Sequence, residues 1–71
     1  MTKEEYRTEH LNCIHNLHNA VFEFDVDFWS GKAFDNIAKA KDIISDSDAD
    51  YARDTISVCE RIARNRIQRG T

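Results

Sequence analysis

The sequence contains no proline and only two glycines among 71 residues. Because these are the residues that most readily interrupt helices, the few remaining breaks are informative. We predict breaks at Ser30-Gly31 and at residues 46–50, and we expect Gly70 to end the last helix. The sequence therefore predicts an all-α fold of one helical domain, residues 1–71, with helices at about 3–29, 32–45 and 48–69.

Long apolar runs and a cysteine framework are also missing. No run of about 18 apolar residues is present to span a membrane, and residues 1–6 lack the apolar segment of a secretory signal. Two cysteines are too few for a disulfide framework. We therefore predict a cytoplasmic location with reduced thiols, and we expect no membrane partner.

A chain of this length gains little stability from its own core. It buries only about 60% of its unfolded surface, and such a core rarely supplies more than about 3–5 kcal/mol. Without disulfides or a metal, self-association is the expected compensation. We therefore predict a helical bundle that is completed by a second copy, most simply as a homodimer in which the long first helices pack together.

Patterns that carry catalysis or metal binding are absent. His15 and His18 have the spacing of ligands on one helix face, but Cys13 diverges from them. The aspartates of residues 46–50 match the first ligand positions of a calcium-binding loop, yet its twelfth position is Ser57 instead of glutamate. We predict no enzymatic activity, no catalytic residues, no metal and no cofactor.

The first helix is expected to begin with a capping box between Thr2 and Glu5. An apolar stripe then follows in steps of three and four, comprising Ile14, Leu17, Val21, Phe24 and Phe28. Residues 22–28 also alternate strictly between apolar and acidic, which alone is typical of a strand. We favour the helix because no second strand is visible; as a strand, this segment would pair with its copy in another chain.

The other two expected helices carry apolar stripes of their own. Ser30 and Ser47 are the predicted N-caps of the second and third helices. The stripe of the second helix comprises Ala33, Phe34, Ile37, Ala40 and Ile44. The stripe of the third comprises Ala52, Ile56, Cys59, either Ile62 or Ala63, and Ile67.

Aromatic residues concentrate in one part of the chain, where Phe22, Phe24, Phe28, Trp29 and Phe34 fall within thirteen positions. Aromatic side chains are prominent both in cores and in protein interfaces. We assign Phe24, Phe28 and Phe34 to the core. The predicted partner or dimer interface comprises Phe22, Val26, Trp29 and Leu11, and the neighbouring acidic surface comprises Glu23, Asp25 and Asp27.

Charge is divided unevenly along the chain, whose net charge is −3. Residues 23–50 hold eight acidic residues against three lysines, a balance of −5, whereas residues 57–71 hold four arginines against one glutamate, a balance of +3. The arginines are Arg61, Arg64, Arg66 and Arg69. They are candidate nucleic-acid contacts, although basic residues also complement the C-terminal end of a helix dipole.

These features favour a small non-catalytic protein that binds another protein, as a self-associating regulator or inhibitor. Small acidic helical proteins of bacteria and phages offer an analogy at the level of fold. The alternative is a nucleic-acid-binding regulator that uses the arginine-rich last helix of a dimer. A structural subunit without a regulated partner is the third hypothesis.

Overall fold

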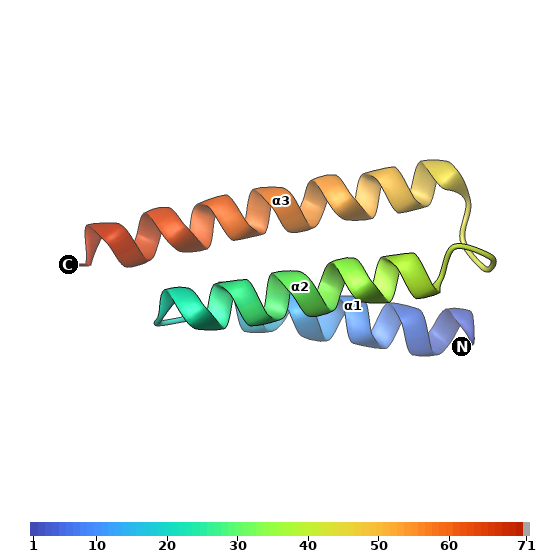
Figure 1. Cartoon of the computed structure of the whole chain (residues 1–71), viewed down its shortest axis with the longest axis horizontal. Helices are drawn as coiled ribbons and strands as arrows, with labels where there is room; N and C mark the ends of the chain where they lie inside the picture. Colours follow the sequence, from blue (N-terminus) through green and yellow to red (C-terminus); the bar gives the residue numbers. More distant parts are fainter. Residues whose placement is uncertain (71) are drawn as a thin grey trace.

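The computed structural model describes residues 1–70, which form three helices and no strand (Figure 1). Helix α1 spans Lys3–His18, α2 spans Glu23–Lys39 and α3 spans Asp46–Arg69. Figure 1 shows α1 and α2 as neighbours that run in opposite directions, with α3 lying along them, and every pair of helices is in contact. The predicted all-α, three-helix fold is confirmed, but the boundaries of all three helices differ from those expected.

Helix α1 begins as the sequence predicts and ends much earlier. The amide of Glu5 donates to Thr2 Oγ1 at 3.1 Å, and the amide of Thr2 donates to Glu5 Oε1 at 2.9 Å, which completes the capping box. The backbone hydrogen bond from Thr2 is the main cause that lowers the pKa of Glu5. The helix then stops at His18, so the expected continuation to residue 29 is wrong.

A turn held partly by a distant arginine separates α1 from α2. The side-chain amide of Asn19 donates to the carbonyl of His15 at 2.8 Å, within the last turn of α1. Arg66, on α3, donates to the carbonyls of Leu17 at 3.2 Å and Ala20 at 2.7 Å. Carbonyls at a helix C-terminus lack intrahelical partners. Arg66 donates to one of these, the carbonyl of Leu17, and to the carbonyl of Ala20 in the turn.

Helix α2 contains both the alternating segment and the expected break. Phe22 is its N-cap, with an extended backbone, and Glu23–Lys39 are helical. The helical prediction for residues 22–28 is therefore confirmed from Glu23 onward, although these residues begin α2 instead of extending α1. The break predicted at Ser30 and Gly31 is wrong, because α2 passes through both, with Ser30 buried and Gly31 exposed.

Helix α3 is capped at both ends. Its N-cap is Ser45, whose hydroxyl accepts from the amide of Asp48 at 3.1 Å, so the prediction of Ser47 was two residues late. Gly70 is the C-cap, as expected. Between the second and third helices the chain turns through residues 40–45, where the amide of Ile43 donates to the carbonyl of Ala40 at 2.9 Å. The predicted extension of the second helix to residue 45 is therefore wrong.

The core is narrow and built from all three helices. Its largest fully buried side chains are Leu17 and Cys13 from α1, Val26 and Ile37 from α2, and Ile56 from α3. Small residues fill much of the remaining space, comprising Ala20, Ala33, Ala40, Ala49, Ala52 and Ala63. The alternative between Ile62 and Ala63 is decided for Ala63, which is 1% exposed, whereas Ile62 is 49% exposed.

Candidate protein-binding surface

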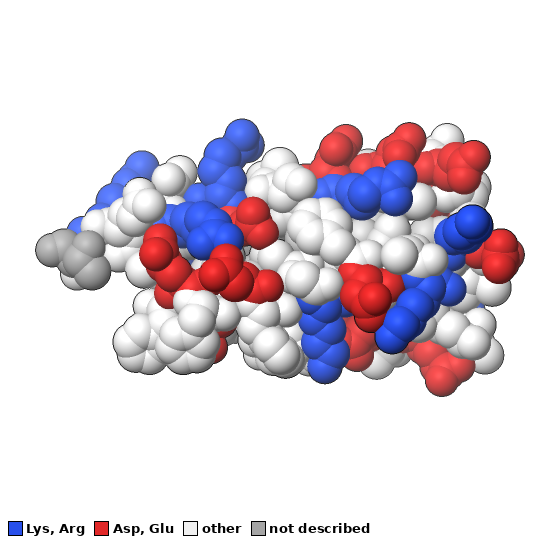
Figure 2. Space-filling view, in the orientation of Figure 1, with Lys and Arg blue, Asp and Glu red and all other residues white. Residues whose placement is uncertain are grey.

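Four apolar side chains lie exposed at the start of α2 and in the turn before it. The exposed fractions are 67% for Val21, 59% for Phe22, 68% for Phe24 and 57% for Phe28. We call these four residues the aromatic patch. Figure 2 shows uncharged side chains gathered at this end of the molecule, bordered by acidic and then by basic side chains.

The rings around the aromatic patch are held in defined pairs. Phe22 stacks on Phe24, with ring centroids 5.5 Å apart and an interplanar angle of 9°. Phe28 meets Trp29 edge to face at 5.0 Å. The ammonium of Lys32 lies 5.7 Å from the centroid of Phe28 and 5.3 Å from that of Trp29. These contacts limit the freedom of the exposed rings, which lowers the entropic cost of binding them to another surface.

The structure separates the four residues of the predicted interface. Phe22 is exposed in the aromatic patch, and Leu11 is exposed on α1, outside it. Trp29 is partly buried against the core. Val26 is 0% exposed and belongs to the core, so it is not available to a partner in this monomer.

The predicted core aromatics also divide. Phe34 packs against the core, but Phe24 and Phe28 are exposed, which corrects their assignment. The reason is the turn after α1: α2 is a separate helix, so its core-facing positions do not continue the apolar stripe of α1. The face of α2 that meets the core comprises Val26, Ser30, Ala33 and Ile37, in steps of three and four. Sequence reasoning missed this phase because it continued the apolar stripe through the turn.

A notch lies next to the aromatic patch, where α3 extends beyond the turn between α1 and α2 (Figure 1). The notch is open to solvent and has a volume of about 900 Å³. Its lining residues are Ala20, Val21, Phe22, Glu23 and Phe24 on one side and Arg66, Ile67, Gln68 and Gly70 on the other. The notch therefore joins apolar rings to the basic end of α3.

The predicted acidic residues lie at the start of α2. Glu23 and Asp25 occupy its first turn, where negative charge is favourable to the helix dipole. Asp27 forms an ion pair with Arg64 of α3, and Glu60 lies 3.9 Å from the same guanidinium. Of the three acids, Asp27 thus joins two helices, whereas Glu23 lines the notch.

Two of the four arginines of α3 have contacts inside the molecule. The pKa of Arg64 is raised, chiefly by its hydrogen bond to Asp27. Arg66 donates to the backbone of the turn that follows α1. Arg61 and Arg69 are exposed. The predicted set of nucleic-acid contacts therefore includes two residues that also hold the bundle together.

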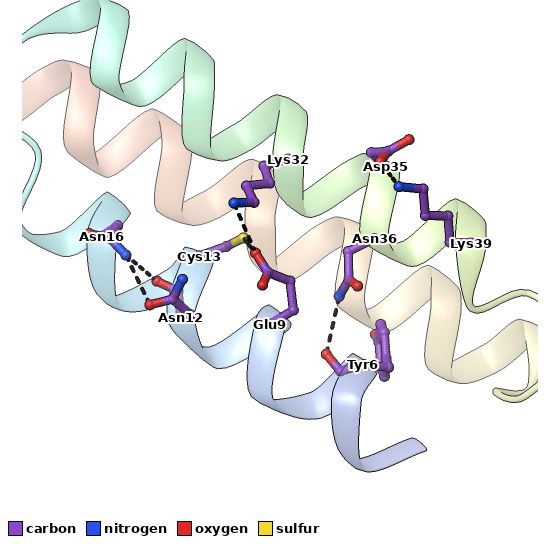
Figure 3. A network of polar contacts seen from close by, with 9 residues as sticks. All are labelled: Tyr6, Glu9, Asn12, Cys13, Asn16, Lys32, Asp35, Asn36 and Lys39. Carbon is purple, nitrogen blue, oxygen red and sulfur yellow. Dashed lines mark hydrogen bonds and ion pairs between the residues drawn. The ribbon is translucent and has the colours of Figure 1, made fainter. Parts of the chain in front are cut away.

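Polar contacts between α1 and α2 surround one cysteine (Figure 3). Lys32 lies 3.7 Å from Glu9, and the thiol of Cys13 donates to the same carboxylate at 3.7 Å. The side-chain amide of Asn36 donates to the carbonyl of Tyr6 at 3.1 Å. Burial, reinforced by Glu9, raises the pKa of Cys13 to about 11, so the thiol is protonated at neutral pH.

The histidines do not gather around this cysteine in a ligand set. His10 is partly buried, and burial lowers its pKa, whereas His15 and His18 are exposed. Within residues 1–70, no group of three or more histidine, cysteine or acidic side chains is arranged to hold a metal ion. No helix in the same range is long and apolar enough to cross a membrane.

Comparison with known proteins gives no match: no family model, no curated protein and no solved structure corresponds to the chain. The function must therefore be inferred from the surface of the protein. Its most distinctive part is the aromatic patch beside the notch.

Proposed function

We propose that this chain is a small non-catalytic protein–protein interaction module, which associates with itself and regulates or inhibits a partner protein by binding it. The aromatic patch is the observation that carries the proposal. At roughly 200 Å² for a phenylalanine, its exposed side chains present roughly 400 Å² of apolar surface. Patches of this size on small proteins are often functional. The proposal keeps the cytoplasmic location predicted from the sequence.

The chemistry of the two thiols supports a binding role over a catalytic one. A nucleophilic cysteine needs a lowered pKa and access to substrate. Cys13 is fully buried with a pKa of about 11, and burial also raises the pKa of Cys59. By contrast, exposed aromatic rings beside charged side chains have the composition of binding hot spots.

The test is affinity capture from host lysate, with and without nuclease, using the wild-type chain and the variant Phe24→Ala/Phe28→Ala. The control variant is Tyr51→Ala, which removes an aromatic side chain that is 76% exposed on α3, outside the patch. We expect wild type and control to recover the same protein. Recovery by the double variant should fall at least tenfold, which is about the effect of losing one hot-spot residue.

Circular dichroism checks that the double variant keeps its helices, which we expect because both side chains are exposed. Equal recovery by the double variant would place the binding surface elsewhere. Recovery that disappears with nuclease would instead favour the alternative function, binding of nucleic acid through Arg61, Arg64, Arg66 and Arg69.

A further inference from the structure

Helix α3 is longer than the two helices that support it. It has 24 residues, compared with 16 in α1 and 17 in α2. At 1.5 Å per residue, α3 exceeds α2 by about 10 Å. The excess projects at the C-terminal end, past the turn between α1 and α2 (Figure 1). One end of the molecule therefore carries both a projecting helix end and the notch beneath it.

The two sides of this notch carry opposite charges, Glu23 on α2 and Arg66 on α3. Asp25 and Arg69 lie in the same helix turns, next to the notch lining. Arg66 is engaged with the turn after α1. Within residues 1–70, Glu23 on the notch wall acts electrostatically on Arg64 but forms no ion pair within 4.0 Å, and neither does Arg69 on the projecting end.

We infer that the notch receives the projecting α3 end of a second copy of this chain, in a reciprocal two-fold dimer. The inference rests on the proposed function and specifies how self-association occurs. A two-fold interface uses the same surface on both copies, so that surface must be complementary to itself. This end meets the requirement in shape and in charge: each copy offers a projection and a recess, and Arg69 of each copy faces Glu23 of the other.

The size of the molecule favours such an overlap over contact between flat ends. The bundle is 41 × 19 × 13 Å across its Cα atoms. Contact between two ends would use only the 19 × 13 Å backbone cross-section, whereas each partner in a standard interface buries roughly 800 Å² of accessible surface. Overlap of the two α3 ends adds the sides of both projections and covers Val21, Phe22 and Phe24, which line the notch.

The experiment measures the dimer dissociation constant by sedimentation equilibrium for wild type, Glu23→Lys and Arg69→Glu. Each variant turns two symmetric attractions into repulsions, so we expect dissociation to become at least about tenfold easier. The matched controls are Asp42→Lys and Lys41→Glu, which change the net charge equally but lie in the connection at the other end of the bundle (Figure 1). Both controls should dimerise like wild type.

An equimolar mixture of Glu23→Lys and Arg69→Glu provides the decisive reading. In a mixed dimer, the lysine introduced at position 23 of one copy faces the glutamate introduced at position 69 of the other. The second pair is the unaltered Glu23 and Arg69, so both pairs are attractive. The mixture should therefore dimerise within about threefold of wild type at low salt. Circular dichroism of each variant confirms that it remains helical.

Three results would overturn the inference: a wild-type monomer at all concentrations, single variants that dimerise normally, or a mixture that does not recover. Failure here is distinguished from failure of partner binding by capture with Phe28→Ala alone, because Phe28 lies outside the notch, whereas Phe24 lines it. If the protein is a monomer but still captures a partner protein, only the proposed self-association is wrong. If it forms the dimer with the expected charge dependence but captures no partner, only the proposed regulatory role is wrong.

Discussion

Replacing Arg66 by alanine tests how the turn between α1 and α2 is held. The guanidinium donates to the carbonyls of Leu17 and Ala20, in partly buried positions. A hydrogen bond to a charged group contributes about 1.5–3 kcal/mol. Because Arg66 is itself exposed and water can replace part of the interaction, we take about 2 kcal/mol for both bonds together. For a domain of this size, that loss lowers the melting temperature by about 10 °C.

The assay is thermal unfolding followed by far-ultraviolet circular dichroism and by the fluorescence of Trp29, the single tryptophan, which packs against the core. Melting is recorded at a concentration low enough that the midpoint no longer depends on it. The control Arg61→Ala removes an exposed arginine of the same helix and should change the midpoint by less than about 2 °C. Equal midpoints for Arg66→Ala and Arg61→Ala would refute the reasoning.

Two further predictions concern the middle of α2 and the buried thiol. Gly31→Ala should stabilise the fold by about 1 kcal/mol, because Gly31 is helical and an added Cβ meets nothing within 4 Å. Ser30→Ala should stabilise it by about the same amount, because the buried Ser30 hydroxyl has no hydrogen-bond partner among residues 1–70. Urea titration measures both: destabilisation by Gly31→Ala would contradict a continuous helix here, and destabilisation by Ser30→Ala would contradict an unpartnered hydroxyl. Cys13 has a raised pKa in the folded state, so its contribution to stability is complete below about pH 9 and is lost as pH rises toward about 11. Cys13→Ala should flatten the fall of stability in that range, and an unchanged slope would count against the buried, protonated thiol.

Local signals were sufficient for much of the fold. The capping box of Thr2 and Glu5 needs only residues three apart, and it lies where the sequence predicts it. The core-facing stripe of α3 was also predicted, because Ala52, Ile56 and Ala63 follow helical spacing within one uninterrupted helix. Serine before a run of aspartates marked the start of α3 to within two residues, and the N-cap proved to be Ser45.

The end of α1 could not be predicted locally, since part of its cause lies almost fifty residues away. Arg66 reaches the carbonyls of Leu17 and Ala20 only after α3 has packed against the turn. Meanwhile the apolar steps of three and four continue without interruption through residues 14–28, which favours one long helix. The break was predicted at Ser30 and Gly31 because both residues weaken helices. Isolated residues of this kind are tolerated within a packed helix such as α2.

The position of this turn decides which aromatic residues become surface. An alternating segment would place all its apolar residues on one face of a strand, but in a helix successive residues are separated by about 100°. Phe24 and Phe28 each lie two residues from Val26 and therefore about 160° away around α2. With Val26 fully buried, both rings must point outward, as their exposure shows. The helix itself does not require phenylalanine at these two positions, and their exposure is the observation on which the proposed binding surface rests.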